Sequence, residues 1–216
     1  MIDLDFAMEG VEPARHSITP LLLFKLRLVN RTPETAVEHI ALTVQVRIEA
    51  ARRAYAAAER ERLVELFGAA ADWDRSLRGM LWTTVGVPVP GFAEDCAVEL
   101  PVSCSCDFEI AASKFLYGIR DGEIPLLLLF SGPVFFRDAG GDLQIGQIAH
   151  HKEATYRLPA GLWHSLMAQH YPDKIWLRVE QGLFDELYRY KRERGFASFD
   201  QALGALLAAA SAEALR

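Results

Sequence analysis

Several features that would assign this chain of 216 residues to a membrane or secreted class are missing. No apolar run approaches the roughly 20 residues that a membrane-spanning helix needs. The N-terminal residues, Met1 to Asp5, do not show the positive segment followed by an apolar segment that marks a secretory signal. We therefore expect a cytoplasmic protein that neither spans nor binds a membrane.

Cysteine, basic clusters and nucleotide-binding motifs are also scarce. The three cysteines are an odd number, so they do not make a disulfide framework. A formal net charge of −6 argues against nucleic acid as the main partner, because the basic runs that exist, Arg52-Arg53 and Lys191-Arg192, stand beside acids and are interpreted as solvated helix faces. No glycine-rich phosphate loop is present, and Ser131-Gly132 lacks the preceding glycine of a hydrolase nucleophile elbow. No cofactor is expected from these patterns.

The strongest structural signal is the apolar run from Glu123 to Phe136. Gly122 and Pro125 bound it on one side, and Gly132-Pro133 interrupts it near the other end. Such a run predicts a strand buried on both faces, in which each buried Leu or Phe contributes about 1.5–3 kcal/mol. Because proline cannot donate to a ladder and glycine tolerates unusual dihedrals, a bend or bulge is predicted at Gly132-Pro133.

Alternation of apolar and polar residues predicts most of the remaining strands. In His39–Ala50, for example, every second residue from Ile40 to Ile48 is apolar, so one face is buried and the other is wet. The prolines at 88 and 90 indicate an edge strand. The predicted strands are Leu4–Val11, Thr19–Asn30, His39–Ala50, Trp73–Phe92, Val98–Ile110, Leu143–His150, Ala154–Leu158 and Lys174–Val179.

Helical spacing predicts four helices, most of them late in the chain. They are Ala51–Phe67, Pro159–Tyr171, a helix that Gly195 ends, and a last helix that begins at Ser198 with a capping box to Gln201. Residues 111–120 fit either a strand or a helix. The predicted fold is α+β, an antiparallel β-rich sandwich with helices toward the C-terminus. One domain is expected over 1–216, with a β-rich part at 1–158 and a helical part at 159–216 packed on it.

The Cys104-x-Cys106 pair raises the question of a metal or redox site. A zinc site needs four ligands, and ligand pairs usually have two to four residues between them, whereas here only one intervenes. Further ligands would have to come from Cys96, His150 or His151. The preferred interpretation is that both thiols pack in the core on the face shared by Val102, Phe108 and Ile110.

Asp107 and Glu109 would share the wet face of the same strand, one pleat apart. Paired carboxylates can divide acid and base roles, and His151 could add a general base. A solvated strand face and a solvated turn explain all three without any chemistry, so no catalytic residue is assigned. The four tryptophans, Trp73, Trp82, Trp163 and Trp176, are spread one per element and are interpreted as core anchors.

With these segments in place, the chain resembles an uncharacterised bacterial family of unknown function, mainly actinobacterial, over roughly residues 23–207. The resemblance implies an accessory or maturation role, because genes of that family often neighbour those of uptake [NiFe]-hydrogenases. The family pattern has an aromatic residue where Cys106 stands here, which weakens a two-cysteine metal site further. The matching stretches are Leu63–Gly68, Leu81-Trp82, Val89–Phe92, Cys104–Glu109, Gly122–Leu126, Phe130–Gly132, and Leu158-Pro159 with Trp163.

Three functional hypotheses follow, in descending order. The first is a non-catalytic accessory protein that binds a partner protein through an edge strand or the C-terminal helices; homo-oligomerisation stays open. The second is a metal- or redox-active protein that uses Cys104 and Cys106 with His150 or His151. The third is a small-molecule enzyme that uses Asp107, Glu109 or His151.

Overall fold

The computed structural model describes residues 2–105, 107, 110–138, 140–172, 174–175 and 177–214, apart from the side chain of Asp74. The chain forms two compact units, Met1–Trp176 and Leu177–Arg216. Each unit is described by itself below. The expectation of a single domain over 1–216, with its helical part packed on the β-rich part, stays a prediction.

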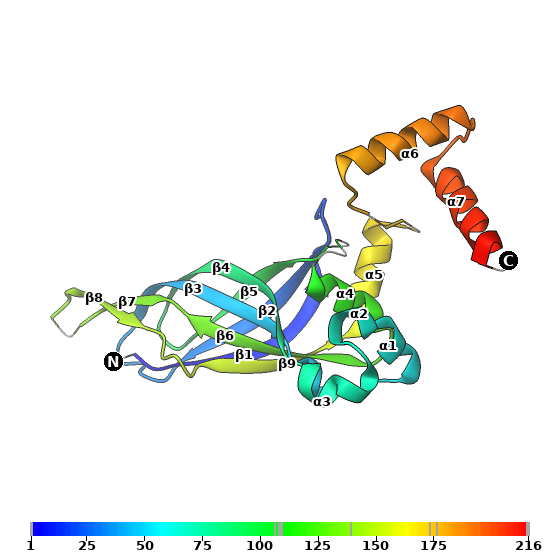
Figure 1. Cartoon of the computed structure of the whole chain (residues 1–216). Coiled ribbons are helices and arrows are strands. Elements are labelled where there is room, and N and C mark those ends of the chain that lie inside the picture. The colour runs from blue at the N-terminus through cyan, green and yellow to red at the C-terminus, as the bar shows by residue number, and fades with distance from the viewer. Residues whose placement is uncertain are drawn as a thin grey trace. The chain divides into compact units, whose positions relative to one another are not determined.

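The described residues of the first unit form two antiparallel sheets, which confirms the predicted α+β, sandwich-like fold with helices toward the C-terminus. The smaller sheet has the order β1 (Leu4–Pro13), β2 (Leu21–Asn30), β5 (Asp95–Ser103). In the larger sheet, β3 (Val37–Ile48) pairs with β4 (Met80–Phe92) on one side and with both β6 (Glu123–Ser131) and β7 (Pro133–Arg137) on the other. Beyond these lie β9 (Glu153–Pro159), paired with β6, and β8 (Leu143–Gln147), paired with β7. Figure 1 shows the strands with α1 to α5 gathered at one end of the sheets.

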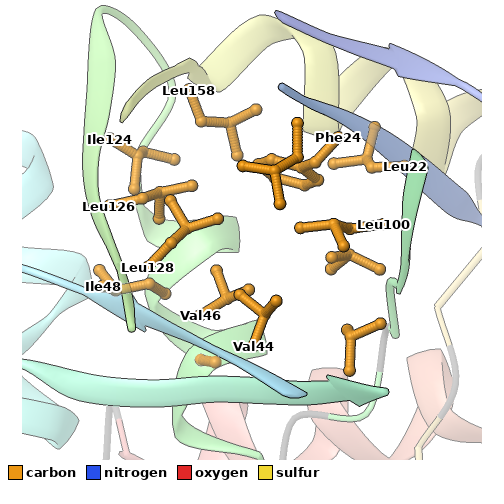
Figure 2. Packing of buried hydrophobic residues seen from close by; sticks show 14 of the residues in the cluster. Leu22, Phe24, Val44, Val46, Ile48, Leu100, Ile124, Leu126, Leu128 and Leu158 are labelled. Atoms are coloured by element: carbon orange, nitrogen blue, oxygen red, sulfur yellow. The ribbon is translucent and has the colours of Figure 1, made fainter. Parts of the chain in front are cut away.

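Alternation along the strands builds the core between the two sheets. Every second residue of β3 from Ile40 to Ile48 is buried, as the pattern predicts, while the residues between them are exposed or half-buried. Figure 2 shows that the inward residues of β2, β3, β5 and β6 point toward one another. The ten labelled there are Leu22, Phe24, Val44, Val46, Ile48, Leu100, Ile124, Leu126, Leu128 and Leu158.

The central apolar run becomes two strands that meet at Gly132. β6 and β7 keep one register against β3, since Thr43 faces Ser131 and Ile40 faces Val134. Their other neighbour changes at that point, from β9 to β8. Gly132 has φ +136°, and a Cβ there would come within 2.1 Å of the carbonyl oxygen of Ala41, so a side chain is excluded. The predicted interruption at Gly132-Pro133 is therefore confirmed.

The sequence predicts burial on both faces of this run, whereas the structure buries only one face fully. The inward side chains from Ile124 to Phe130 are buried, but Leu127 and Leu129 on the opposite face are only half-buried.

The prolines of β4 behave as predicted: among the described residues β4 pairs only with β3, with Pro88 and Pro90 opposite Ala41 and His39. Because β4 is an edge strand, its prolines do not have to donate hydrogen bonds to a second neighbouring strand.

The prediction of a strand through Ile110 is wrong. β5 ends at Ser103, and the Oγ of Ser105 then accepts the Asp107 N–H at 2.9 Å. The Asp107 carbonyl accepts the Ile110 N–H at 3.2 Å, which closes a turn before helix α4 (Ala111–Gly118). The serine hydroxyl and the turn compete with ladder pairing here. Residues 111–118, which fitted either class, are thus helical.

Two other segments also differ from their predicted form. The helix expected over 51–67 is broken into a 3₁₀ turn and the helices α1 (Ala57–Arg62) and α2 (Val64–Phe67), with Gly68 at φ +74° as the predicted stop. The region expected to be strand from Trp73 begins with the short helix α3 (Trp73–Ser76). Edge-to-face contacts among Tyr55, Phe67, Trp73 and Phe115 hold these short helices against α4. Tertiary contacts therefore decide the local structure here, and propensity does not.

Helix α5 (Ala160–His170) follows β9 almost as predicted. The strand expected at 174–179 is wrong, because the described residues of that segment form no ladder. Of the tryptophans interpreted as core anchors, Trp73 and Trp163 are buried and Trp82 is partly buried against the core, while Trp176 lies outside the described residues.

The second unit consists of α6 (Gln181–Glu193) and α7 (Phe199–Ala214). Gly195 ends α6 at φ +69°, as predicted. The predicted cap of α7 is present, since the Ser198 Oγ accepts the Gln201 N–H at 3.2 Å. The Gln201 side chain accepts the N–H of Ala197 rather than that of Ser198.

Candidate functional site

The thiols considered as metal ligands lie on the sandwich. Cys104 is 7 % exposed and belongs to the core, where its thiol lies 3.9 Å from the Val102 carbonyl oxygen and its N–H donates to Pro20. Cys96 lies on β5, partly buried against the same core, and burial raises the pKa of its thiol. Cys106 lies outside the described residues. The burial of Cys104 matches the core packing predicted for it, and the same prediction for Cys106 falls outside the described residues.

His150 and His151 occupy an exposed turn between β8 and β9 rather than the end of a strand. Their rings stand edge to face with centroids 5.8 Å apart. In the part of the chain that the structure describes, no three His, Cys, Asp or Glu side chains come together in a way that could hold a metal ion. The described geometry therefore gives no support to a metal site built on these residues.

The strand predicted to carry Asp107 and Glu109 ends before them, at Ser103. Asp107 lies half-buried in the turn before α4, and Glu109 lies outside the described residues. Ile110, expected on the inward face, is 45 % exposed. Because β5 ends at Ser103, no described strand carries Asp107, and the arrangement predicted for the pair is not supported.

A pocket of about 460 Å³ lies between α4 and α5 in the first unit. Helical spacing places Trp163, Met167 and Tyr171 along one stripe of α5 and the residue after it, facing Ser113 and Tyr117 of α4. The volume falls in the range of small-molecule sites. Because the two helices are separated by more than 40 residues of sequence, neither helix pattern by itself indicates this pocket.

The polar groups around the pocket are basic or neutral. Arg120 places its guanidinium 4.5 Å from the centre of the Tyr117 ring, and Lys174 lies on the rim. His164 Nε2 lies 2.6 Å from the Ile119 carbonyl oxygen, so this nitrogen carries the proton and donates. Burial lowers the pKa of His164, which keeps the ring neutral near pH 7. Nδ1 is then an acceptor.

Trp163 carries an unusual group behind the wall of this pocket. Its side chain is 3 % exposed, yet its indole N–H has no hydrogen-bond partner among the described residues. Buried tryptophan N–H groups normally find an acceptor. Trp73 illustrates the normal case, because its N–H donates to the Gly68 carbonyl at 3.0 Å.

A second candidate is the exposed surface of the helical unit. Among its described residues only Ala202 is buried. The rings of Phe184, Tyr188 and Phe199 lie within 6.4 Å of one another, and most of the large apolar side chains around them are exposed. We call this set the helical apolar face: Leu183, Phe184, Tyr188, Leu203, Leu206 and Leu207.

Sequence reasoning proposed the C-terminal helices as a partner-binding element but did not identify the residues of the helical apolar face, and it missed the pocket. The signals in the sequence are the helical spacing of Phe184, Leu187 and Tyr188 and the Ala-rich last helix. The pocket depends on Tyr117 and Arg120, which lie in and next to a segment whose class the pattern left open. In the sequence, the pocket was indicated only by the adjacent Trp163 and His164 within a predicted helix.

Comparison with known proteins bears on the family and leaves the chemistry open. A family model described as a family of unknown function, DUF6084, matches residues 1–215. The chain belongs to this family. A search of curated proteins finds no match to it. Among the described residues of this DUF6084 chain, no helix has the length and apolar character needed to cross a membrane.

Proposed function

We propose that this DUF6084 chain is a non-catalytic accessory protein that binds a partner protein through its helical apolar face. One observation carries the proposal: within 177–214, two helices of 13 and 16 residues bury a single alanine. Isolated helices of this length are marginal in water, and proteins obtain most helical stability from packing an apolar face. The unit therefore has the composition of a surface that packs against another protein.

Exposure of apolar side chains is concentrated in this unit. Among the described residues, it holds seven of the fourteen large apolar side chains that are exposed, in less than a quarter of the chain. Contiguous apolar surface rimmed by polar groups marks interaction sites in water-soluble proteins. Basic residues gather at the end of α6, where Arg189, Lys191, Arg192 and Arg194 stand beside one acid, Glu193. The partner that fits is a protein with an apolar patch and an acidic rim.

The finer parts of the proposal come from the resemblance alone. It implies a bacterial, cytoplasmic protein that assists the assembly or function of a [NiFe]-hydrogenase. A hydrogenase subunit or maturation factor is then the first partner to test. A second copy of the chain is the alternative occupant of the same face.

Site-directed photo-crosslinking tests the proposal. A photoreactive amino acid replaces Leu207, which is 69 % exposed on α7, and the matched control position is Leu81, which is half-exposed on β4. In the native host we expect one specific adduct from the photoreactive residue at position 207. The same adduct should not form from position 81. It should also disappear from position 207 when Leu203→Glu is added.

Mass spectrometry of the adduct separates the occupants. An adduct of twice the chain mass identifies a second copy, and a heavier or lighter one identifies a different protein. A cross-link within one chain, or no specific adduct together with a monomer in size-exclusion chromatography, would contradict the proposal.

A further inference from the structure

We propose that the pocket between α4 and α5 binds a small aromatic carboxylate. The described residues that line it all belong to the first unit, so the inference does not depend on the partner-binding proposal.

The walls suit a flat, apolar body. Tyr117, Trp163 and Tyr171 supply three aromatic rings, and Met167 adds a flexible, polarisable side chain between them. Aromatic rings stack on and pack edge to face against other rings, and methionine sulfur also contacts rings favourably. About 460 Å³ lies toward the small end of ligand pockets, which fits a single ring with a short side chain.

The charge of the pocket selects an anion. Arg120 and Lys174 are its charged lining groups, and no acidic side chain lines it among the described residues. The guanidinium of Arg120 lies 4.5 Å from the centre of the Tyr117 ring, so the cation stands beside an aromatic wall of the pocket.

The unpartnered indole N–H of Trp163 lies behind the wall of the pocket, because the nitrogen itself is buried. A ligand therefore meets the Trp163 ring and not its N–H. A carboxylate can accept two parallel hydrogen bonds from the guanidinium of Arg120, which makes Arg120 the group that recognises the charge.

The test follows the indole N–H signals of ¹⁵N-labelled full-length protein by NMR during titration with phenylacetate. Phenylacetamide is the uncharged control, and inorganic phosphate is the control for unspecific anion binding. Trp163→Phe assigns the Trp163 signal by its disappearance. We expect phenylacetate to move this signal saturably. The Trp73 signal should stay in place, because that N–H already donates to Gly68.

Two substitutions set the size of the effect. Arg120→Gln should weaken phenylacetate binding about tenfold, the typical value of one hydrogen bond to a charged group. Arg137→Gln makes the same charge change on β7, away from the pocket lining, and should leave the affinity unchanged. Trp163→Phe, used for the assignment, keeps a buried ring, and unfolding by heat verifies that all three variants stay folded.

Three results would overturn the inference. One is a Trp163 signal that does not move up to about 10 mM phenylacetate, well above the affinity of a weak specific ligand. Another is equal binding of phenylacetamide, which would remove the carboxylate from recognition. The third is equal weakening by Arg120→Gln and Arg137→Gln, which would reduce the effect to net charge.

Discussion

The β-sandwich and the helical unit of this chain use apolar residues in opposite ways. In the sandwich, alternation along strands such as β2 and β3 sends every second side chain into one continuous core shared by two sheets. In the helical unit, residues of similar hydrophobicity cluster on one face of each helix and stay exposed. Apolar composition alone therefore does not tell a core from a binding surface; the presence of a second layer does.

The contrast is also energetic. Burying a Leu or Phe side chain contributes about 1.5–3 kcal/mol, and the sandwich collects this contribution from dozens of residues. The helical unit gains almost none of it by itself, so its helices depend on caps such as Ser198 and on whatever covers them. The four predictions below test this comparison through stability.

The largest effect is expected when a ring is removed from the core. Phe24→Ala should lower the free energy of unfolding by about 3–5 kcal/mol, because Phe24 is fully buried between the sheets and leaves a cavity. Phe184→Ala removes the same ring from α6, where it is 42 % exposed, and should cost far less. Urea unfolding followed by circular dichroism measures both. Similar losses for the two variants would break the comparison.

A somewhat smaller loss in the free energy of unfolding is expected when the buried ion pair that anchors α1 is broken. Arg53 Nη2 lies 2.5 Å from Glu59 Oε1, with both side chains about nine-tenths buried, and Arg53 also donates to the carbonyls of Asp121 and Glu123. Glu59→Ala leaves this guanidinium buried without its counter-charge and should cost about 3 kcal/mol.

Glu61→Ala is the matched control for this pair, because Glu61 is exposed on the same short helix. It should change the free energy of unfolding by less than about 0.5 kcal/mol. Equal effects of the two substitutions would show that α1 is as loosely held as the helices of the second unit.

The sequence predicted the sandwich better than the helical layer for a physical reason. A strand with one wet face has a period of two, and β2 and β3 show it without exception from Leu22 to Leu28 and from Ile40 to Ile48. The stop at Gly68 and the interruption at Gly132 follow from glycine's access to positive φ. These features are local, so local patterns reveal them.

Two features were missed: a local turn set by side-chain and backbone hydrogen bonds, and a pocket assembled by distant contacts. The strand expected through Ile110 ends at Ser103 because Ser105 and Asp107 form a turn, although the alternation of polar and apolar residues continues past it. The arrangement predicted for the candidate carboxylate pair is not supported without that strand. The α4–α5 pocket brings Tyr117 next to Trp163 from two separate segments, and only the folded chain reveals it.

A moderate effect is expected where the N-terminal strand is tied to the larger sheet. Lys152 lies 2.7 Å from Asp3 and 3.1 Å from Asp5. Lys152→Met should lower the free energy of unfolding by about 1 kcal/mol at pH 7, the value of a favourable, partly buried ion-pair network. Lys25→Met removes a more exposed pair with Glu12 and should cost less.

The pH dependence of this difference has a definite sign. Hydrogen bonds from Arg31 and then from Lys152 lower the pKa of Asp5, so its contribution is present above the ordinary value near 4 and is lost as pH falls through the folded pKa. The hydrogen bond to Asp3 raises the pKa of Lys152, so that contribution is lost only as pH rises through a value above about 10.4. Wild type and Lys152→Met should therefore converge below about pH 4, measured by urea unfolding across pH. A difference that stays constant down to pH 2 would assign the effect to packing of the lysine stem.

The smallest effect is expected on the helical apolar face. Leu207→Ala removes three carbons from a residue that is 69 % exposed, and alanine favours the helix slightly more than leucine does. The free energy of unfolding should change by less than about 0.5 kcal/mol, in urea at neutral pH. A loss of 2 kcal/mol or more would mean that this leucine is buried against something in the isolated chain. The face would then be part of a core, and the partner-binding proposal would lose the observation that carries it.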